Sequence, residues 1–349
     1  MIYKGNKIFE DTPTAADEYR LGYIKGIEDY ILRKNSESQA VRESLFEKYM
    51  LAGRVDEYRK IYRDMLGLSA FEGQVLPPTE CILAGCDDVC DIYRLRVYIT
   101  PEIPMYAMLF LPRATEAVPL VVAQHGGGGT PELCSDLVGK NNYNNMVRRV
   151  LERGAAVIAP QLLLWSISES ETMRAHNIPY ERRDVDNALK HIGTSITALE
   201  ISGIMRCIDY AIALPGIEAS KIGMIGASYG GYFTLHTMAA DERIKAGYVA
   251  CVFNDRDVYG WGDFVYRGSA ALLHDAEVAS LCAPRKLYIS VGKDDRVFNY
   301  RYAIEEGERA KKYFERLGCP ESLRFSVWDG GHTVEDSDEG YDFMFSALK

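Results

Sequence analysis

The chain has 349 residues, of which 47% are hydrophobic and 11% aromatic, as in soluble globular proteins rather than disordered ones. Its formal net charge is −10, and no cluster of lysines and arginines is dense enough to form a nucleic-acid or anionic-membrane face. We therefore expect neither nucleic acid nor a membrane as a partner, and we expect a small, neutral or uncharged substrate.

The N-terminus has no apolar core followed by a small-residue cleavage site, and no stretch of the chain approaches 18 apolar residues. These features predict a cytoplasmic protein. Three of the eight cysteines (Cys81, Cys86 and Cys90) are closely spaced, but no tight fourth cysteine or histidine ligand lies nearby. We expect free thiols in a reducing compartment and no metal site.

Residues 1–80 are predicted to form a helical N-terminal extension. Capping residues and early acids at 11–18 precede apolar positions at 19–31 that recur with three- and four-residue spacing. A second helix is predicted at 39–51 and a third at 55–66, with charges typical of a solvated outer face. The sequence leaves open whether the extension covers the sheet, forms part of the substrate pocket or mediates formation of a homo-oligomer.

Residues 81–349 are predicted to form an α/β catalytic domain. The alternation at 92–99 and the run at 106–111 predict an antiparallel hairpin at a sheet edge, and the apolar run 119–123 predicts a strand covered on both faces. Strands and helices then alternate, which predicts a mostly parallel sheet with helices on both faces. The strands are expected at 155–159, 222–225, 246–252, 286–291 and 323–328, and the helices at 144–153, 196–214, 232–240, 302–317 and 341–348.

A long polar connection, Leu162 to Thr194, falls between a strand and its helix. Connections of this length in compact domains are usually functional or locally helical. We interpret residues 162–194 as a lid insertion that forms a wall of the substrate pocket.

The stretch Gly226-Ala-Ser-Tyr-Gly230 is a G-x-S-x-G motif between a predicted strand and a predicted helix. A sharp strand-to-helix turn exposes the serine hydroxyl at the carboxyl edge of the sheet, and the glycines provide the space that this turn requires. The alternative is an ordinary glycine turn with a bystander serine. The context favours Ser228 as a nucleophile.

A serine hydroxyl needs a base, and the base needs an acid that fixes its tautomer. His332 stands in a loop directly after a predicted strand near the C-terminus, where a base on this architecture belongs. It is favoured over the remaining histidines, His125, His176, His191, His236 and His274. For the acid we favour Asp295, directly after the strand 286–291, over its neighbour Asp294 and over Asp255.

The oxyanion of a tetrahedral intermediate needs backbone N–H donors that come close to it. The residue after the nucleophile, Tyr229, is expected to supply one. The glycine run that follows His125 should supply the other, with Gly127 favoured and Gly126 next. A phosphate cradle is the alternative for this run, but the flanking residues of the nucleotide-binding glycine motifs are missing.

These residues resemble the α/β-hydrolase superfamily in its order of serine, acid and histidine. The region Gly226-Ala-Ser-Tyr-Gly-Gly-Tyr232 is similar to the nucleophile region of prolyl-oligopeptidase-type hydrolases. The runs His125-Gly-Gly-Gly-Gly129, Asn254-Asp-Arg256 and Ala283-Pro-Arg285, with the helical extension, resemble bacterial acetyl xylan esterases and dienelactone-hydrolase-like proteins. Dienelactone hydrolases proper use cysteine where this chain has Ser228.

The resemblance implies an α/β-hydrolase fold over residues 90–349 and a serine carboxylic-ester hydrolase without metal or organic cofactor. It also implies a short acyl group on a carbohydrate or similar small ester as the substrate. Two alternatives remain open at this point. The first is a peptidase of the prolyl-oligopeptidase type, and the second is a non-catalytic binding protein on a hydrolase scaffold.

Overall fold

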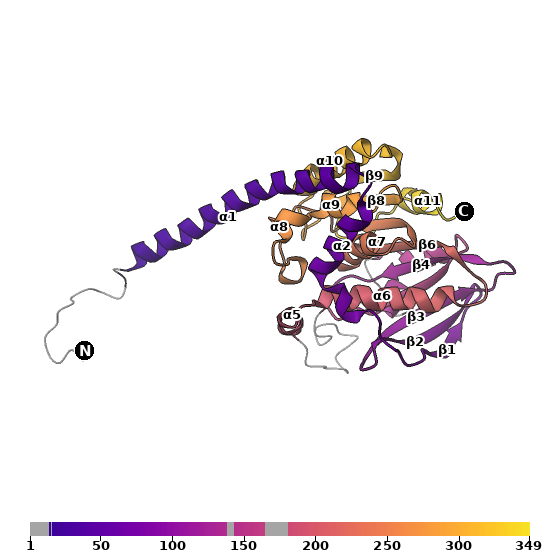
Figure 1. The fold of residues 1–349 in the computed structure, drawn as a ribbon. Coiled ribbons are helices and arrows are strands. Elements are labelled where there is room, and N and C mark those ends of the chain that lie inside the picture. Colours follow the sequence, from indigo (N-terminus) through magenta and orange to yellow (C-terminus); the bar gives the residue numbers. More distant parts are fainter. Residues whose placement is uncertain (1–13, 15, 138–142, 165–180) are drawn as a thin grey trace, which may run out of the picture.

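The computed structural model describes residues 14, 16–137, 143–164 and 181–349. Over these residues one sheet has the strand order β1-β2-β3-β5-β4-β6-β7-β8-β9 (Figure 1). The pairs from β1 to β5 along this order are antiparallel, and the pairs from β5 to β9 are parallel. The strands are β1 (Glu80–Cys86), β2 (Cys90–Thr100), β3 (Ile103–Pro112), β4 (Val118–Gln124), β5 (Ala156–Pro160), β6 (Ile217–Ala227), β7 (Ile244–Ala250), β8 (Lys286–Gly292) and β9 (Leu323–Trp328).

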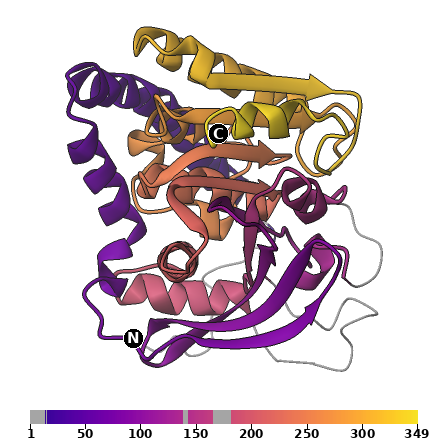
Figure 2. The same cartoon turned by 90° about the vertical axis from the view of Figure 1, so that its right-hand side faces the viewer.

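Helices cover both faces of the sheet, which confirms the predicted α/β-hydrolase architecture (Figure 2). The core on one face includes residues of α6, α7 and α10, and the core on the other includes residues of α4 and α11. The helices are α1 (Asp17–Leu45), α2 (Val55–Leu66), α3 (Pro131–Cys134), α4 (Met146–Leu151), α5 (Arg182–His191), α6 (Ile196–Ile212), α7 (Tyr229–Ala240), α8 (Ser269–Leu272), α9 (Asp275–Ser280), α10 (Tyr300–Arg316) and α11 (Glu339–Phe345). Within the described parts of the chain, no helix is long and apolar enough to cross a membrane.

The edge of the sheet differs from the prediction. The expected hairpin is present as β2 and β3, but β1 pairs with the outer side of β2 and forms the edge instead. Every residue of β1 is exposed. Because neither face of β1 is buried, its sequence carries no alternation of apolar and polar residues from which a strand could be predicted.

The prediction of a separate helix at 39–51 is wrong. The helix α1 continues without a break from Asp17 to Leu45 and passes directly into a π-helical turn, η1 (Phe46–Leu51). The intervening polar residues contain no glycine or proline. Ion pairs of Glu37 with Arg33 (2.7 Å) and Lys34 (2.6 Å) also support the helix at three- and four-residue spacing.

The second half of the N-terminal extension packs against the body of the protein. The side chains of Phe46, Tyr58 and Tyr62 are completely buried and belong to the same core as α7. The hydroxyl of Tyr62 lies 2.7 Å from Nδ1 of His236 on α7. This part of the extension therefore packs against α7, the helix that begins directly after Ser228.

Candidate active site

Ser228 occupies a strained turn between the end of β6 and the start of α7. Its φ and ψ are 57° and −124°, a region that residues other than glycine rarely adopt. A Cβ atom on Gly226 would lie 2.3 Å from the carbonyl oxygen of Gly230, and one on Gly230 would lie 2.0 Å from the carbonyl oxygen of Gln124. Both glycines of the motif are therefore required by close backbone contacts.

His332 and Asp295 come together on the loops that follow β9 and β8. Nδ1 of His332 donates a hydrogen bond to Oδ2 of Asp295 at 2.8 Å. The other carboxylate oxygen, Oδ1, accepts hydrogen bonds from the N–H groups of Val297 (2.7 Å) and Phe298 (3.0 Å). The Asp295 side chain is only 2% exposed. The backbone thus fixes one oxygen of the carboxylate and leaves the other to orient the imidazole.

Cys251 is part of this region, although the sequence analysis missed it. Burial disfavours the charged imidazole of His332, but hydrogen bonds with Asp295 and with the Cys251 thiol raise its pKa above the ordinary value. Cys251 follows β7, and the preceding carbonyl, that of Ala250, accepts a 2.9 Å hydrogen bond from the N–H of Ser228. Cys251 directly follows β7, which lies between the strand that leads to Ser228 and the strand that leads to Asp295. This position is the signal that could have identified it.

The other predicted acids lie elsewhere. Asp294 is exposed, and its N–H group donates to the carbonyl of Gly330 at 2.9 Å. Asp255 lies beside Asp257 and His274, with possible ligand atoms of the three residues within 4.8 Å of one another. Of the competing histidines, His125, His236 and His274 are buried and His191 is exposed at the end of α5, whereas His176 falls outside the described residues.

The glycine run after β4 lies directly against the turn at Ser228. A Cβ atom on Gly126 would lie 3.0 Å from Cβ of Ser228. The N–H group of Gly126 already donates a 2.9 Å hydrogen bond to the hydroxyl of Tyr143. Gly127 is partly exposed, and its N–H group donates no hydrogen bond to any residue that the structure describes. Of the two glycines, Gly127 has the amide that can serve a ligand.

His125 fixes the shape of this run. Its Nδ1 donates to the carbonyl of Gly126 at 2.9 Å, and its Nε2 accepts from the N–H group of Leu162 at 2.9 Å. Burial lowers the pKa of His125 to about 4, so the ring is neutral and can both donate and accept. His125 therefore connects the glycine run to the chain that leaves β5.

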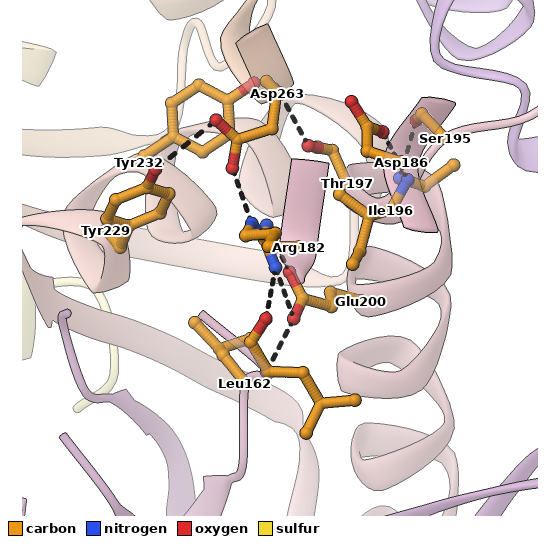
Figure 3. Close-up of polar contacts among 12 residues, drawn as sticks. Leu162, Arg182, Asp186, Ser195, Ile196, Thr197, Glu200, Tyr229, Tyr232 and Asp263 are labelled. Atoms are coloured by element: carbon orange, nitrogen blue, oxygen red, sulfur yellow. Dashed lines mark hydrogen bonds and ion pairs between the residues drawn. The ribbon is translucent and has the colours of Figure 1, made fainter. Parts of the chain in front are cut away.

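A buried ion network lies beside Tyr229 (Figure 3). Arg182, at the start of α5, donates to Glu200 on α6 at 2.8 Å and to Asp263 at 2.6 Å. Asp263 also accepts a hydrogen bond from the Tyr229 hydroxyl at 3.3 Å, and the guanidinium lies 5.6 Å from the centre of the Tyr229 ring. This network connects the end of the predicted lid to the residue after Ser228. Residues 165–180 of that lid lie outside the described residues, and the lid stays a prediction.

A row of aromatic side chains runs from Tyr229 to His332. The ring centroids of Tyr229 and Trp261 are 5.4 Å apart, those of Trp261 and Phe298 are 5.2 Å apart, and those of Phe298 and His332 are 5.8 Å apart. Trp261 is partly exposed. The row gives the site an apolar wall beside the groups that can accept and donate protons.

Several solved structures resemble this fold. The methylesterase BT1017 is 16% identical, with a TM-score of 0.66 over 89% of this chain and 68% of that one. A putative acetyl xylan esterase from Bacteroides fragilis is 13% identical, with a TM-score of 0.62 over 85% and 83%. A glucuronoyl esterase from Solibacter usitatus is 15% identical, with a TM-score of 0.59 over 85% and 92%. At these identities the likeness shows the fold alone.

No curated protein sequence matches the chain significantly. The sequence pattern of the dienelactone hydrolase family, however, matches residues 107–301, which is more than half of the chain. The matched region contains Ser228, Asp295 and the glycine run, and it ends before His332. The chain belongs to the dienelactone hydrolase family.

Proposed function

We propose that the protein is a serine esterase in which Ser228 is the nucleophile, His332 the general base and Asp295 the group that orients His332. The observation that carries the proposal is the 2.8 Å hydrogen bond between His332 and the buried Asp295, on loops at the same edge of the parallel sheet as the strained turn of Ser228. The bond holds the proton on Nδ1 of His332 and leaves Nε2 to accept the proton of the serine hydroxyl.

The reaction proceeds through an acyl-enzyme. The Ser228 oxygen attacks the ester carbonyl while its proton passes to His332, and the imidazolium then protonates the departing alcohol. Water attacks the acyl group in the second half of the reaction, and His332 acts again first as base and then as acid. Each proton has an assigned carrier among the protein's own side chains, and the proposal invokes no cofactor.

The amides of Tyr229 and Gly127 are proposed to hold the oxyanion. Tyr229 is the first residue of α7, where the helix dipole favours negative charge. Gly127 is preferred to Gly126 because the Gly126 amide is already bound to Tyr143.

For the substrate we propose a short acyl ester of a carbohydrate or similar small molecule, encountered in the cytoplasm. The partly exposed ring of Trp261 supports this assignment, because an indole face in the wall of a site can pack against the C–H groups of a sugar ring. The similar solved structures include esterases named for acetyl xylan and for glucuronoyl groups, which makes these esters the first to test.

The test measures hydrolysis of p-nitrophenyl acetate and release of acetate from acetylated xylo-oligosaccharides. We expect wild-type protein to hydrolyse both substrates, and we expect Ser228→Ala to lose activity by several orders of magnitude. Trp261→Ala should raise KM for the oligosaccharide more than for the small ester. Equal activity of wild type and Ser228→Ala would refute the nucleophile. Cleavage of a proline-containing peptide in place of both esters would instead favour a peptidase.

A further inference from the structure

The N-terminal part of α1 projects away from the body of the protein (Figure 1), and it carries a large apolar surface that no other described residue covers. Every residue from Asp17 to Lys34 is exposed. The exposed large apolar side chains in this stretch are Tyr19, Leu21, Tyr23, Ile24, Ile27, Tyr30, Ile31 and Leu32, at 44–81% exposure. We call these eight side chains the arm surface.

The arm surface is larger than the apolar patches that most monomeric soluble proteins expose. The side chains of Tyr19, Tyr23 and Tyr30 are 81%, 74% and 54% exposed. At ~200 Å² for a whole aromatic side chain, these three tyrosines alone expose roughly 400 Å². The largest apolar patch on a typical soluble monomer is about 300–600 Å², and the five aliphatic side chains extend the arm surface further. An exposed apolar surface of this size indicates an interaction site for a partner.

The sequence of the arm specifies a helix as that partner. Arg20, Ile24, Ile27, Ile31 and Lys34 follow one another at alternating spacings of four and three residues. This repeat forms a continuous seam along one side of a helix, as in a two-stranded coiled coil. The seam has three isoleucines at its centre and a basic residue at each end. Tyr23 and Tyr30 flank the seam on one side and Leu21 flanks it on the other, so a helix laid along it would contact both flanks.

We propose that the partner is the α1 helix of a second copy of this chain, packed antiparallel about a two-fold axis between Lys25 and Gly26. In this register Ile24 of each copy faces Ile27 of the other. Lys34 then lies opposite Asp17, so that the basic end of each seam is paired with an acidic residue of the other copy. A parallel pairing would bring Arg20 against Arg20 and Lys34 against Lys34, which like-charge repulsion disfavours.

The contact reaches the size of a specific interface. The 18 residues from Asp17 to Lys34 make a helix of about 27 Å, or five turns. If each copy covers half of its arm surface, the two copies together bury on the order of 1,000 Å², which is the lower limit for a specific interface. Because the arm leaves the body near Asn35, each hydrolase body would lie at one end of the paired helices, with its candidate active site outside the contact.

The test is the mass of the full-length protein in solution, measured by light scattering after gel filtration over a range of concentrations. We expect wild type at twice the chain mass of 39.2 kDa. The double variant Ile24→Glu/Ile27→Glu should run at the monomer mass, with dimer affinity reduced at least ~100-fold. Its ester hydrolysis per chain should be unchanged. The matched control Lys25→Glu/Asp29→Lys changes charge on the opposite side of the helix and should stay dimeric.

Charge exchange tests the antiparallel register. Asp17→Lys should weaken the dimer, and Asp17→Lys/Lys34→Asp should restore it, because these residues face each other between copies. A monomeric wild type at 100 µM would overturn the proposal, and cosedimentation of that monomer with anionic vesicles would assign the arm surface to a membrane instead. A dimer that survives Ile24→Glu/Ile27→Glu with unchanged affinity would overturn it as well.

Discussion

Replacing Asp295 with asparagine tests how the loop after β8 selects the tautomer of His332. In the native protein Oδ1 of Asp295 accepts hydrogen bonds from the backbone N–H groups of Val297 and Phe298. Its Oδ2 accepts a hydrogen bond from the N–H at Nδ1 of His332. An asparagine must keep its carbonyl oxygen toward the two backbone donors, because its NH₂ group would repel them. The NH₂ group then faces His332, so Nδ1 becomes an acceptor and the ring proton moves to Nε2, which can no longer accept the proton of Ser228.

We expect Asp295→Asn to lower kcat for p-nitrophenyl acetate on the order of 10⁴-fold, which corresponds to about 5.5 kcal/mol of transition-state stabilisation. KM should change little, because the Asp295 side chain is buried against His332 and has no proposed contact with the substrate. The exposed neighbour supplies the control, and Asp294→Asn should stay within a factor of two of wild type. A loss of less than 10-fold in Asp295→Asn, in protein with an unchanged urea midpoint, would refute the reasoning.

Four further predictions follow from the surroundings of the site. Arg182→Leu leaves two buried carboxylates without a counter-charge and should lower the free energy of unfolding by about 3–5 kcal/mol in urea titrations; a loss below 1 kcal/mol would contradict a buried network. Because its neighbours raise the pKa of His332 and the base must be neutral, kcat/KM should rise with pH through a midpoint above ~6.5. Cys251→Ala should move that midpoint to lower pH without abolishing activity, and an unmoved midpoint would exclude the thiol from this role. His125→Ala releases the glycine run and should lower kcat on the order of 100-fold while Ser228 still reacts with an irreversible inhibitor; unchanged kcat would exclude a positioning role.

The parts of the fold that were predictable are those in which local sequence and burial agree. The strand 119–123 is apolar throughout because β4 lies inside the sheet with both faces covered. The turn at Ser228 was predictable because its serine and glycines form one local pattern between a strand and a helix, although the close contact that requires Gly230 is with the distant Gln124. The edge strand β1 was not, because an exposed strand has no buried face to pattern it.

The parts of the site that were missed depend on contacts between distant segments. Nothing in the sequence distinguishes Arg182, Glu200 and Asp263 from ordinary surface charges. They form a buried network only because three separate segments of the chain pack together. The choice between Asp294 and Asp295 had the same difficulty, since adjacent residues share one local pattern. Asp295 contacts His332 because the following backbone amides turn its side chain inward.

The most direct test of the central claim is the identity of the acylated residue. The protein is treated with a fluorophosphonate, which traps activated serine nucleophiles, and separately quenched during turnover of p-nitrophenyl acetate; the modified peptide is then mapped by mass spectrometry. We predict that one adduct per chain forms on Ser228 in both experiments and is lost in Ser228→Ala and Asp295→Asn. Modification of Cys251 in place of Ser228, or an active enzyme that forms no covalent adduct, would contradict the account.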